Sequence, residues 1–284
     1  MERNMILSME HFPIRAKFGE EQTFKMLKDA GFSGVDYSFN AWGDGTSIDL
    51  ENHIEKAKET KRLLEKYGLV ANQAHAPFFF KYGEEMSLEN KNFLDIVRSF
   101  EYASIIGVKG VVVHSIKLPD GVDFFEYTTK YYKALEPYAK RFGVKIAVEN
   151  LVNSKFHSPK VQCEFIRSLN SDVFCACVDV GHSALVNYPP EEYLEKMDSE
   201  LLFCVHLHDT DNKVDRHWTP FQGCHNWDKI MKSLVDIGFN GDMNLEVIHS
   251  FDNVPNALYK DTLEYIAKVG QYLINVFNEY KSSK

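Results

Sequence analysis

Short apolar segments alternate with longer segments of helical periodicity along the whole sequence. The apolar segments predict eight strands, at 5–9, 35–38, 70–75, 110–114, 145–149, 173–179, 202–208 and 243–247. The segments between them predict helices near 20–30, 48–67, 88–106, 123–142, 159–169, 191–197, 227–237 and from 257 to the C-terminus. Strands that alternate with helices form a parallel sheet, because each helix returns the chain to the edge where the next strand begins.

Glycine stands just after five of the predicted helices, at Gly31, Gly68, Gly107, Gly143 and Gly238. Glycine ends a helix readily because it adopts the left-handed conformation without steric cost. The sequences AGFSG at 30–34 and IGFNG at 237–241 are near-copies, which indicates a repeated strand–helix unit. Eight such units close a barrel, usually of ~250 residues. The prediction is an α/β fold, a (β/α)8 TIM barrel that forms a single domain over residues 1–284.

Most of the predicted strands carry a side chain that can bind a metal ion near their carboxyl end. These side chains are His75, His114, Glu149, Asp179, His206 and Glu246. In such a barrel, the loops that follow the strands build the active site at one mouth. Buried polar groups without partners cost free energy, and a metal ion would offset that cost. The pattern therefore predicts a metal centre at the mouth.

Glu149 and Glu246 close otherwise apolar strands, and no Lys or Arg closes another strand to pair with them. A metal ligand or a catalytic acid or base is therefore a better explanation than a buried ion pair. Two opposed glutamates at a metal can move a proton, so we predict that both are catalytic. Asp179 and His182 lie three residues apart, and a helical turn would place both side chains on one face.

The remaining histidines near the predicted mouth are candidates for other roles. His75 and His114 are either hydrogen-bonded interior residues or ligands of a second metal ion. Asp215 and His217 are suited to binding either zinc or a sugar hydroxyl. His208, with the neighbouring Asp209, is expected to brace the ligands around it.

Three residues of the predicted mouth loops are candidates for contact with a substrate. Trp42 and Phe78 could roof a pocket, although aromatic residues in loops often serve packing alone. Arg216 could bind a substrate oxygen or balance the charge of the site.

The composition of the chain argues against two classes of binding partner, membranes and nucleic acids. Hydrophobic residues make up 44% of the chain and charged residues 26%, ordinary values for a globular protein. No apolar run approaches the ~18 residues that span a bilayer, and the opening sequence lacks a basic region followed by a hydrophobic one, so we expect a cytoplasmic protein with no membrane partner. The net charge of −9 and the lack of a Lys/Arg run argue against a nucleic-acid partner. The five cysteines form no CxxC pair, and Cys175 and Cys177, which alternate inside an apolar strand, are expected to pack as small apolar residues.

Several motifs resemble those of the xylose isomerase-like barrel superfamily. They are VEN at 148–150, DVGH at 179–182, HLHDTD at 206–211, DRH with PFQG within 215–223, and LE at 245–246. The resemblance covers nearly the whole chain. This superfamily contains sugar isomerases and epimerases of the tagatose 3-epimerase kind, inosose dehydratases, hydroxypyruvate isomerases and endonuclease IV, so its motifs do not name a substrate.

The epimerase branch implies one divalent ion, typically manganese, with cobalt and zinc as alternatives. Its ligands would be Glu149, Asp179, His206 and Glu246. His182 and Arg216 would contact a small ketose, polyol or related sugar derivative. Proton transfer by the two glutamates through an enediolate would give isomerisation or epimerisation, and expulsion of hydroxide would give a dehydratase of the inosose type.

The endonuclease branch implies nine ligands on three zinc ions, and the sequence has a candidate for each. They are His75, His114, Glu149, Asp179, His182, His206, Asp215, His217 and Glu246. The acidic chain, the few Lys or Arg residues of the mouth loops and the short segment between His206 and Asp215 favour the sugar enzyme. An apurinic-site endonuclease is the alternative, and a non-catalytic sugar- or metal-binding barrel is a third hypothesis. Relatives often pair through their helical faces, which implies a homodimer or homotetramer.

Overall fold

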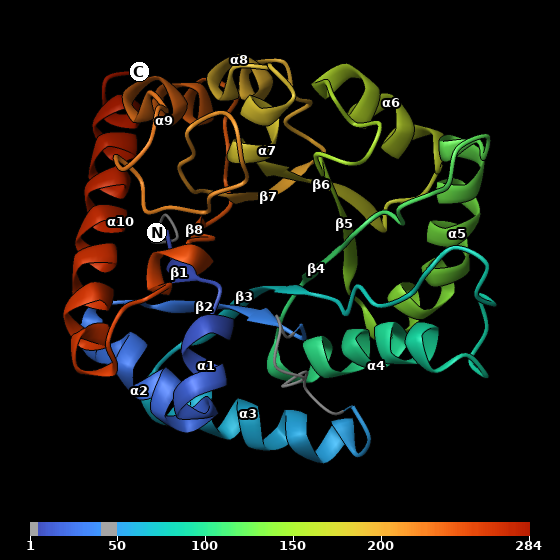
Figure 1. Ribbon diagram of the computed structural model, residues 1–284, viewed down its shortest axis with the longest axis horizontal. Helices are drawn as coiled ribbons and strands as arrows, with labels where there is room; N and C mark the ends of the chain where they lie inside the picture. Colours follow the sequence, from blue (N-terminus) through green and yellow to red (C-terminus); the bar gives the residue numbers. More distant parts are fainter. Residues whose placement is uncertain (1–4, 41–49) are drawn as a thin grey trace.

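Strand–helix units repeat around a ring in the computed structural model, which describes residues 5–40 and 50–284 (Figure 1). The strands are β1 (Leu7–Met9), β2 (Gly34–Ser38), β3 (Val70–His75), β4 (Gly110–Val113), β5 (Lys145–Glu149), β6 (Phe174–Asp179), β7 (Leu202–His206) and β8 (Met243–Leu245). The helices outside them are α1 (Phe12–Phe18), α2 (Glu20–Ala30), α3 (His53–Tyr67), α4 (Lys91–Ile106), α5 (Phe124–Phe142), α6 (Pro159–Ser168), α7 (Val180–Leu185), α8 (Pro190–Glu195), α9 (Trp227–Asp236) and α10 (Tyr259–Ser282). Two short 3-10 helices, η1 (Ile248–Phe251) and η2 (Asn256–Leu258), precede α10.

The strands close into a barrel in sequence order. Strands β2 to β7 form one parallel sheet, and β1 pairs with β8 in parallel. Single bridges join the two parts, Glu10 with Asp36 on one side and Leu207 with Leu245 on the other. On the second side, the amide of Leu207 donates to the carbonyl of Asn244 at 3.0 Å. The predicted (β/α)8 TIM barrel is therefore confirmed.

Most predicted boundaries agree with the structure, and the differences have local causes. The strand predicted at 202–208 ends at His206, because Leu207 then pairs with Leu245 and Asp209 forms an antiparallel bridge with Trp218. Helices α1 and α7 were not predicted; they have 7 and 6 residues, and segments this short seldom show a helical period, although the equally short α8 was found. The predicted polar loop that contains Trp42 lies outside the described residues.

The predicted glycine caps are confirmed. Gly31, Gly68, Gly107 and Gly143 end α2 to α5 in the left-handed conformation, with φ between 62° and 110°. Gly238, with φ of 74°, follows α9. Each glycine turns the chain back toward the amino end of the next strand, so that all the strands run the same way.

The interior of the barrel is plugged by small apolar side chains. Val112, Ala147, Cys175, Cys177 and Cys204 form a buried cluster on β4 to β7, so these three cysteines do pack as apolar residues. The larger core lies between the strands and the surrounding helices. Among the described helices, none is long and apolar enough to cross a membrane.

Candidate metal centre

Successive side chains of a strand point to opposite faces, and a layer of inward-pointing polar side chains lies directly above this plug. Ala147, Cys177 and Cys204 point into the barrel, so the residues two positions further along point inward as well. Those residues are Glu149, Asp179 and His206, the last residues of β5, β6 and β7. Glu246 follows the last residue of β8. The carboxyl ends of neighbouring parallel strands thus bring the predicted ligands to one mouth.

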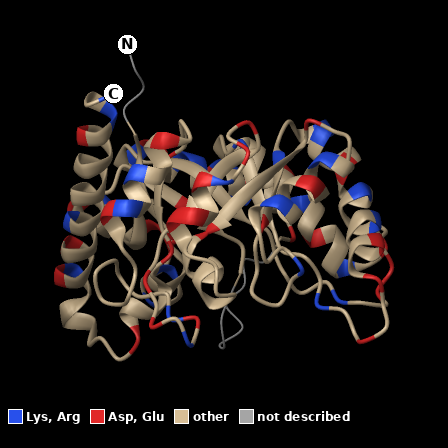
Figure 2. Cartoon of the chain, turned by 90° about the horizontal axis from the view of Figure 1, so that it is seen from above, with Lys and Arg blue, Asp and Glu red and all other residues tan. Residues whose placement is uncertain are grey.

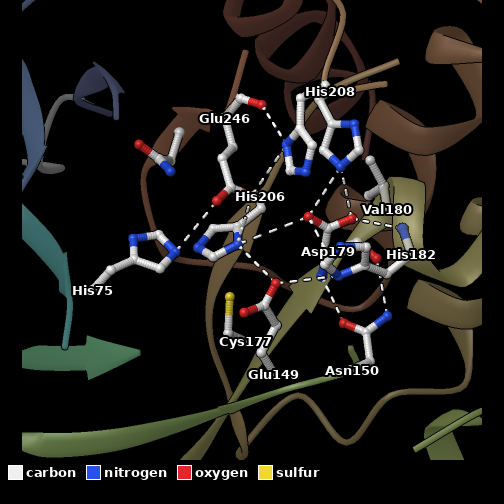
Figure 3. A network of polar contacts seen from close by, with 12 residues as sticks. His75, Glu149, Asn150, Cys177, Asp179, Val180, His182, His206, His208 and Glu246 are labelled. Carbon is white, nitrogen blue, oxygen red and sulfur yellow. Dashed lines mark hydrogen bonds and ion pairs between the residues drawn. The ribbon is translucent and has the colours of Figure 1, made fainter. Parts of the chain in front are cut away.

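These four side chains form one buried cluster with His206 at its centre (Figure 3). One ligand atom of each lies within 4.8 Å of a ligand atom of every other. The Nδ1 atom of His206 is 3.1 Å from Oε2 of Glu246, 3.3 Å from Oε1 of Glu149 and 3.9 Å from Oδ2 of Asp179. Three carboxylates therefore surround one imidazole.

The charges of this cluster depend on one another. Burial alone would raise the pKa of Glu149, but the adjacent imidazoles of His206 and His114 lower this pKa well below its usual value. Burial alone would lower the pKa of His206, but Glu246 and Glu149 raise it well above its usual value. Burial would likewise raise the pKa of Asp179, which His182 and His208 instead lower. The carboxyl groups of Glu149 and Asp179 are thus ionised, and the imidazole of His206 holds a proton.

The donor set suits a divalent cation. Oε2 of Glu149 and Oε2 of Glu246 are buried and lie 3.0 Å and 3.1 Å from imidazole nitrogens of His114 and His206, but neither oxygen has a partner in hydrogen-bond geometry, which is rare for a buried polar atom. Carboxylate oxygens favour manganese, and an imidazole nitrogen also suits zinc and cobalt. The residues present therefore fit the metal ion that the sequence predicts.

Protons and a metal ion would compete for His206, so we expect metal affinity to fall as the pH falls. The raised pKa of His206 means that this side chain carries a proton at about pH 7, and the proton must leave when the ring binds a cation. The lowered pKa values of Glu149 and Asp179 keep these ligands ionised, so they do not cancel the effect. Calorimetric titration of Mn²⁺ in buffers of different ionisation enthalpy should show about one proton released per ion and up to about tenfold weaker binding per pH unit. Affinity that stays constant between about pH 6 and pH 8 would contradict this expectation.

His75 and His114 extend the cluster on one side. The Nε2 atom of His75 is 3.4 Å from Oε1 of Glu246, and Nε2 of His114 is 3.0 Å from Oε2 of Glu149. His75, His114 and Glu149 together form a second group that could hold an ion.

His182, Asp215 and His217 form a third group, on another side of Glu149. The Nδ1 atom of His182 is 3.2 Å from Oε1 of Glu149, and its Nε2 atom is 3.1 Å from Oδ2 of Asp215. The other oxygen of Asp215 lies 3.2 Å from Nε2 of His217. Asp179 caps α7 by accepting the amide of His182, so the helical turn considered from the sequence does form there.

His208 and Asp209 brace this layer, as the sequence suggests. The Nε2 atom of His208 is 2.9 Å from Oδ1 of Asp179, and its ring stacks on His217 with centroids 4.0 Å apart. The carboxylate of Asp209 accepts the indole N–H of Trp227 and the amide of Phe221. Asp209 thereby holds the loop that carries Asp215 and His217 against the barrel.

The cluster opens into a cavity of about 560 Å³. Its lining includes Glu149, Glu246, His114, His182, Asp215 and His217, together with apolar walls of Phe80, Ile116, Leu151 and Leu185. Phe78 lines the cavity as well and stacks on His114. Arg216 is not part of this lining, because its guanidinium donates to Asp211 and lies over the ring of Trp218. A substrate contact by Arg216 therefore stays a prediction.

Two buried carboxyl groups near the cluster escaped the sequence analysis. Asp36, in the middle of β2, lies 3.1 Å from Nδ1 of His75 through Oδ1 and accepts the amide of Gln73 through Oδ2. Glu10, just after β1, is buried beside His75 and Glu246, and its burial raises its pKa to about 7. The sequence feature that could have indicated Asp36 is that it is the single charged residue of the buried strand GVDYS. Asp36 orients His75 toward Glu246.

Comparisons with known proteins place this chain in a family. The family model described as xylose isomerase-like TIM barrel matches residues 24–269. The uncharacterized protein y4fM of Sinorhizobium fredii is 22% identical over 278 residues, which cover 86% of this chain and 87% of y4fM.

Two solved structures show the same fold. A D-tagatose 3-epimerase-like protein superimposes with a TM-score of 0.76 at 18% identity, over 97% of this chain and 99% of that chain. The IOLI protein, solved with a zinc atom, gives a TM-score of 0.71 at 18% identity, over the same shares of the two chains. Because the family model spans most of the sequence, this chain belongs to the xylose isomerase-like TIM barrel family.

Proposed function

We propose that the protein is a divalent-metal-dependent isomerase or epimerase of a small ketose, polyol or related sugar derivative. The observation that carries this proposal is the buried group of Glu149, Asp179, His206 and Glu246, whose two glutamates also line the cavity. The cavity volume of about 560 Å³ lies within the usual range for small-molecule sites. The shared fold with a D-tagatose 3-epimerase-like protein supports the same class of reaction.

Glu149, Asp179, His206 and Glu246 would hold the ion. When bound, a divalent ion polarises a carbonyl oxygen and lowers the barrier to removing a proton from the neighbouring carbon. Manganese, cobalt and zinc all suit this mixture of oxygen and nitrogen donors, and the zinc atom of the IOLI protein is consistent with it.

The two glutamates would carry the proton. Both contact Nδ1 of His206, and in Figure 3 Glu246 lies above this ring and Glu149 below it, so they can approach a substrate from different directions. One would remove the proton to give an enediolate, and the other would return it. Return to the opposite face of the same carbon gives epimerisation, and return to the adjacent carbon gives isomerisation. Expulsion of hydroxide from the same enediolate would make the enzyme a dehydratase.

The remaining cavity residues would position the substrate. His182 and His217 present imidazole edges that can bind sugar hydroxyl groups, and Asp215 between them fixes their orientation. The apolar side chains of Phe80, Ile116 and Leu151 would exclude water from the developing charge.

Hydrogen exchange tests the proposed function. The metal-loaded protein is incubated in deuterated water with a panel of ketoses, and loss of carbon-bound hydrogen is followed by NMR. We expect exchange next to the carbonyl of at least one sugar, and a chelator should stop it. If no sugar of the panel exchanges hydrogen and none is dehydrated, the proposal is refuted.

A second candidate function rests on one observation. The three groups of His75–His114–Glu149, of His182–Asp215–His217 and of the four central ligands together contain all nine residues predicted for three zinc ions. This arrangement would also suit an apurinic-site endonuclease. The acidic chain, with a net charge of −9, favours the sugar enzyme. Incision of duplex DNA that contains an abasic site is the direct assay for the alternative.

His114→Ala separates the two candidates. In a centre with one ion, His114 is not a ligand but contacts the ligand Glu149, so the metal content per chain at saturating metal should not change, whereas the metal affinity should fall by about tenfold to a hundredfold. Elemental analysis of the variant after dialysis against buffer that contains the metal measures the content. A loss of one bound ion per chain would instead assign His114 as a ligand and support the endonuclease.

A further inference from the structure

The cavity carries three lysines that the proposed reaction does not use. Lys81 follows β3, Lys117 follows β4 and Lys213 follows β7, and all three line the cavity. In Figure 2 the loops at the lower edge carry Lys and Arg positions as well as Asp and Glu positions. Three separate loops therefore bring positive charge to one opening.

The ammonium groups of these lysines are available to a ligand. All three residues are exposed, and within residues 5–40 and 50–284 no carboxylate lies within ion-pair distance of their Nζ atoms. Some lysines on the outer helices do have such a partner, such as Lys25 with Asp29 and Lys130 with Glu126, each at 2.6 Å. Lys81, Lys117 and Lys213 differ from the other lysines in that they line the cavity together.

The cavity thus has two differently charged ends. Glu149 and Glu246, at the metal centre, are buried, and the lysines are exposed. The apolar residues Phe80 and Ile116 also line the cavity. A neutral sugar gains little from three ammonium groups, whereas an anionic group gains a charge-assisted contact with each.

We infer that the substrate carries an anionic group, a phosphate or a carboxylate, at the end remote from its carbonyl, and that Lys81, Lys117 and Lys213 bind this group. The inference rests on the proposed function, because the carbonyl is placed at the metal centre. The cavity volume of about 560 Å³ accommodates a sugar of five or six carbons with such a group.

Binding of matched sugars tests the inference. Calorimetry compares D-fructose, D-fructose 6-phosphate and D-fructuronate on the metal-loaded protein, and then D-ribulose with D-ribulose 5-phosphate. We expect at least one charged sugar to bind about tenfold more tightly than its neutral counterpart, and the preference to shrink in high salt. Comparison of the phosphorylated sugars with the sugar carboxylate shows which of the two anionic groups the site prefers.

Two triple variants provide the control. The substitutions K81A, K117A and K213A together should reduce the preference for the charged sugar to about onefold. The substitutions K61A, K160A and K268A remove the same charge from exposed positions on α3, α6 and α10 and should leave the preference unchanged. No preference in either sugar series, or an equal loss in both variants, would overturn the inference.

Deuterium exchange measured on the same samples distinguishes a failure of the proposed reaction from a failure of the proposed anion site. A preference for charged sugars without exchange would keep the anion site and refute the proposed reaction. Exchange into neutral sugars without any preference would keep the reaction and refute the anion site.

Discussion

Glu246→Gln is expected to lower turnover by about a thousandfold or more while leaving the barrel folded. Glutamine is close to glutamate in shape but cannot accept a proton from carbon. The carboxylate of Glu246 is also 3.1 Å from Nδ1 of His206 and 3.4 Å from Nε2 of His75, so its loss weakens the metal centre as well. Exchange rates are therefore measured at saturating metal, so that the remaining defect reports proton transfer.

Glu136→Gln is the matched control for this substitution. The side chain of Glu136 is 13% exposed and that of Glu246 is 10% exposed, so the two glutamates are similarly buried. Glu136 pairs with Lys133 and Lys140 on α5 and does not line the cavity. The control should keep full activity. Exchange at the parent rate in Glu246→Gln, with unchanged thermal unfolding, would remove Glu246 from the mechanism.

Gly181→Ala is expected to disrupt the metal centre through His208. A Cβ atom at position 181 would lie 2.0 Å from Cε1 of His208. The His208 ring is buried and stacked on His217, so it can make room only by leaving its 2.9 Å contact with Asp179. Loss of such an orienting contact weakens metal binding by about tenfold to a hundredfold. Overpacking also destabilises a protein by about 1–3 kcal/mol.

A double-mutant cycle tests this steric cause. His208→Ala alone loses the contact with Asp179 and should weaken metal binding to a similar degree. The double variant, G181A with H208A, should bind metal no worse than H208A, because the new methyl group then has space. Additive losses in the double variant, or parental affinity in Gly181→Ala, would contradict the proposed role of the glycine.

The four proposed ligands were predictable because the geometry of a parallel barrel is simple. Parallel strands end at one mouth, so the polar residues that end apolar strands must meet there. His75, Glu149, Asp179 and His206 are the last residues of their strands, and the strand pattern alone locates them. Glu246, which follows β8 directly, was found in the same way.

The residues that were missed lie where pattern carries little information. Asp36 is a buried charge inside a strand, and only the contact with His75 shows its role. Lys81, Lys117 and Lys213 lie in loops, where no periodicity indicates the direction of a side chain. The mouth loops contain few cations, and these three nevertheless line one cavity.

Metal content per chain tests the proposed centre most directly. Protein purified without added metal is dialysed and measured by elemental analysis. The four-ligand centre predicts about one manganese, cobalt or zinc ion per chain, and this value should persist in His114→Ala at saturating metal. Two or three zinc ions per chain would contradict a single-metal sugar enzyme and assign the outer histidines as ligands.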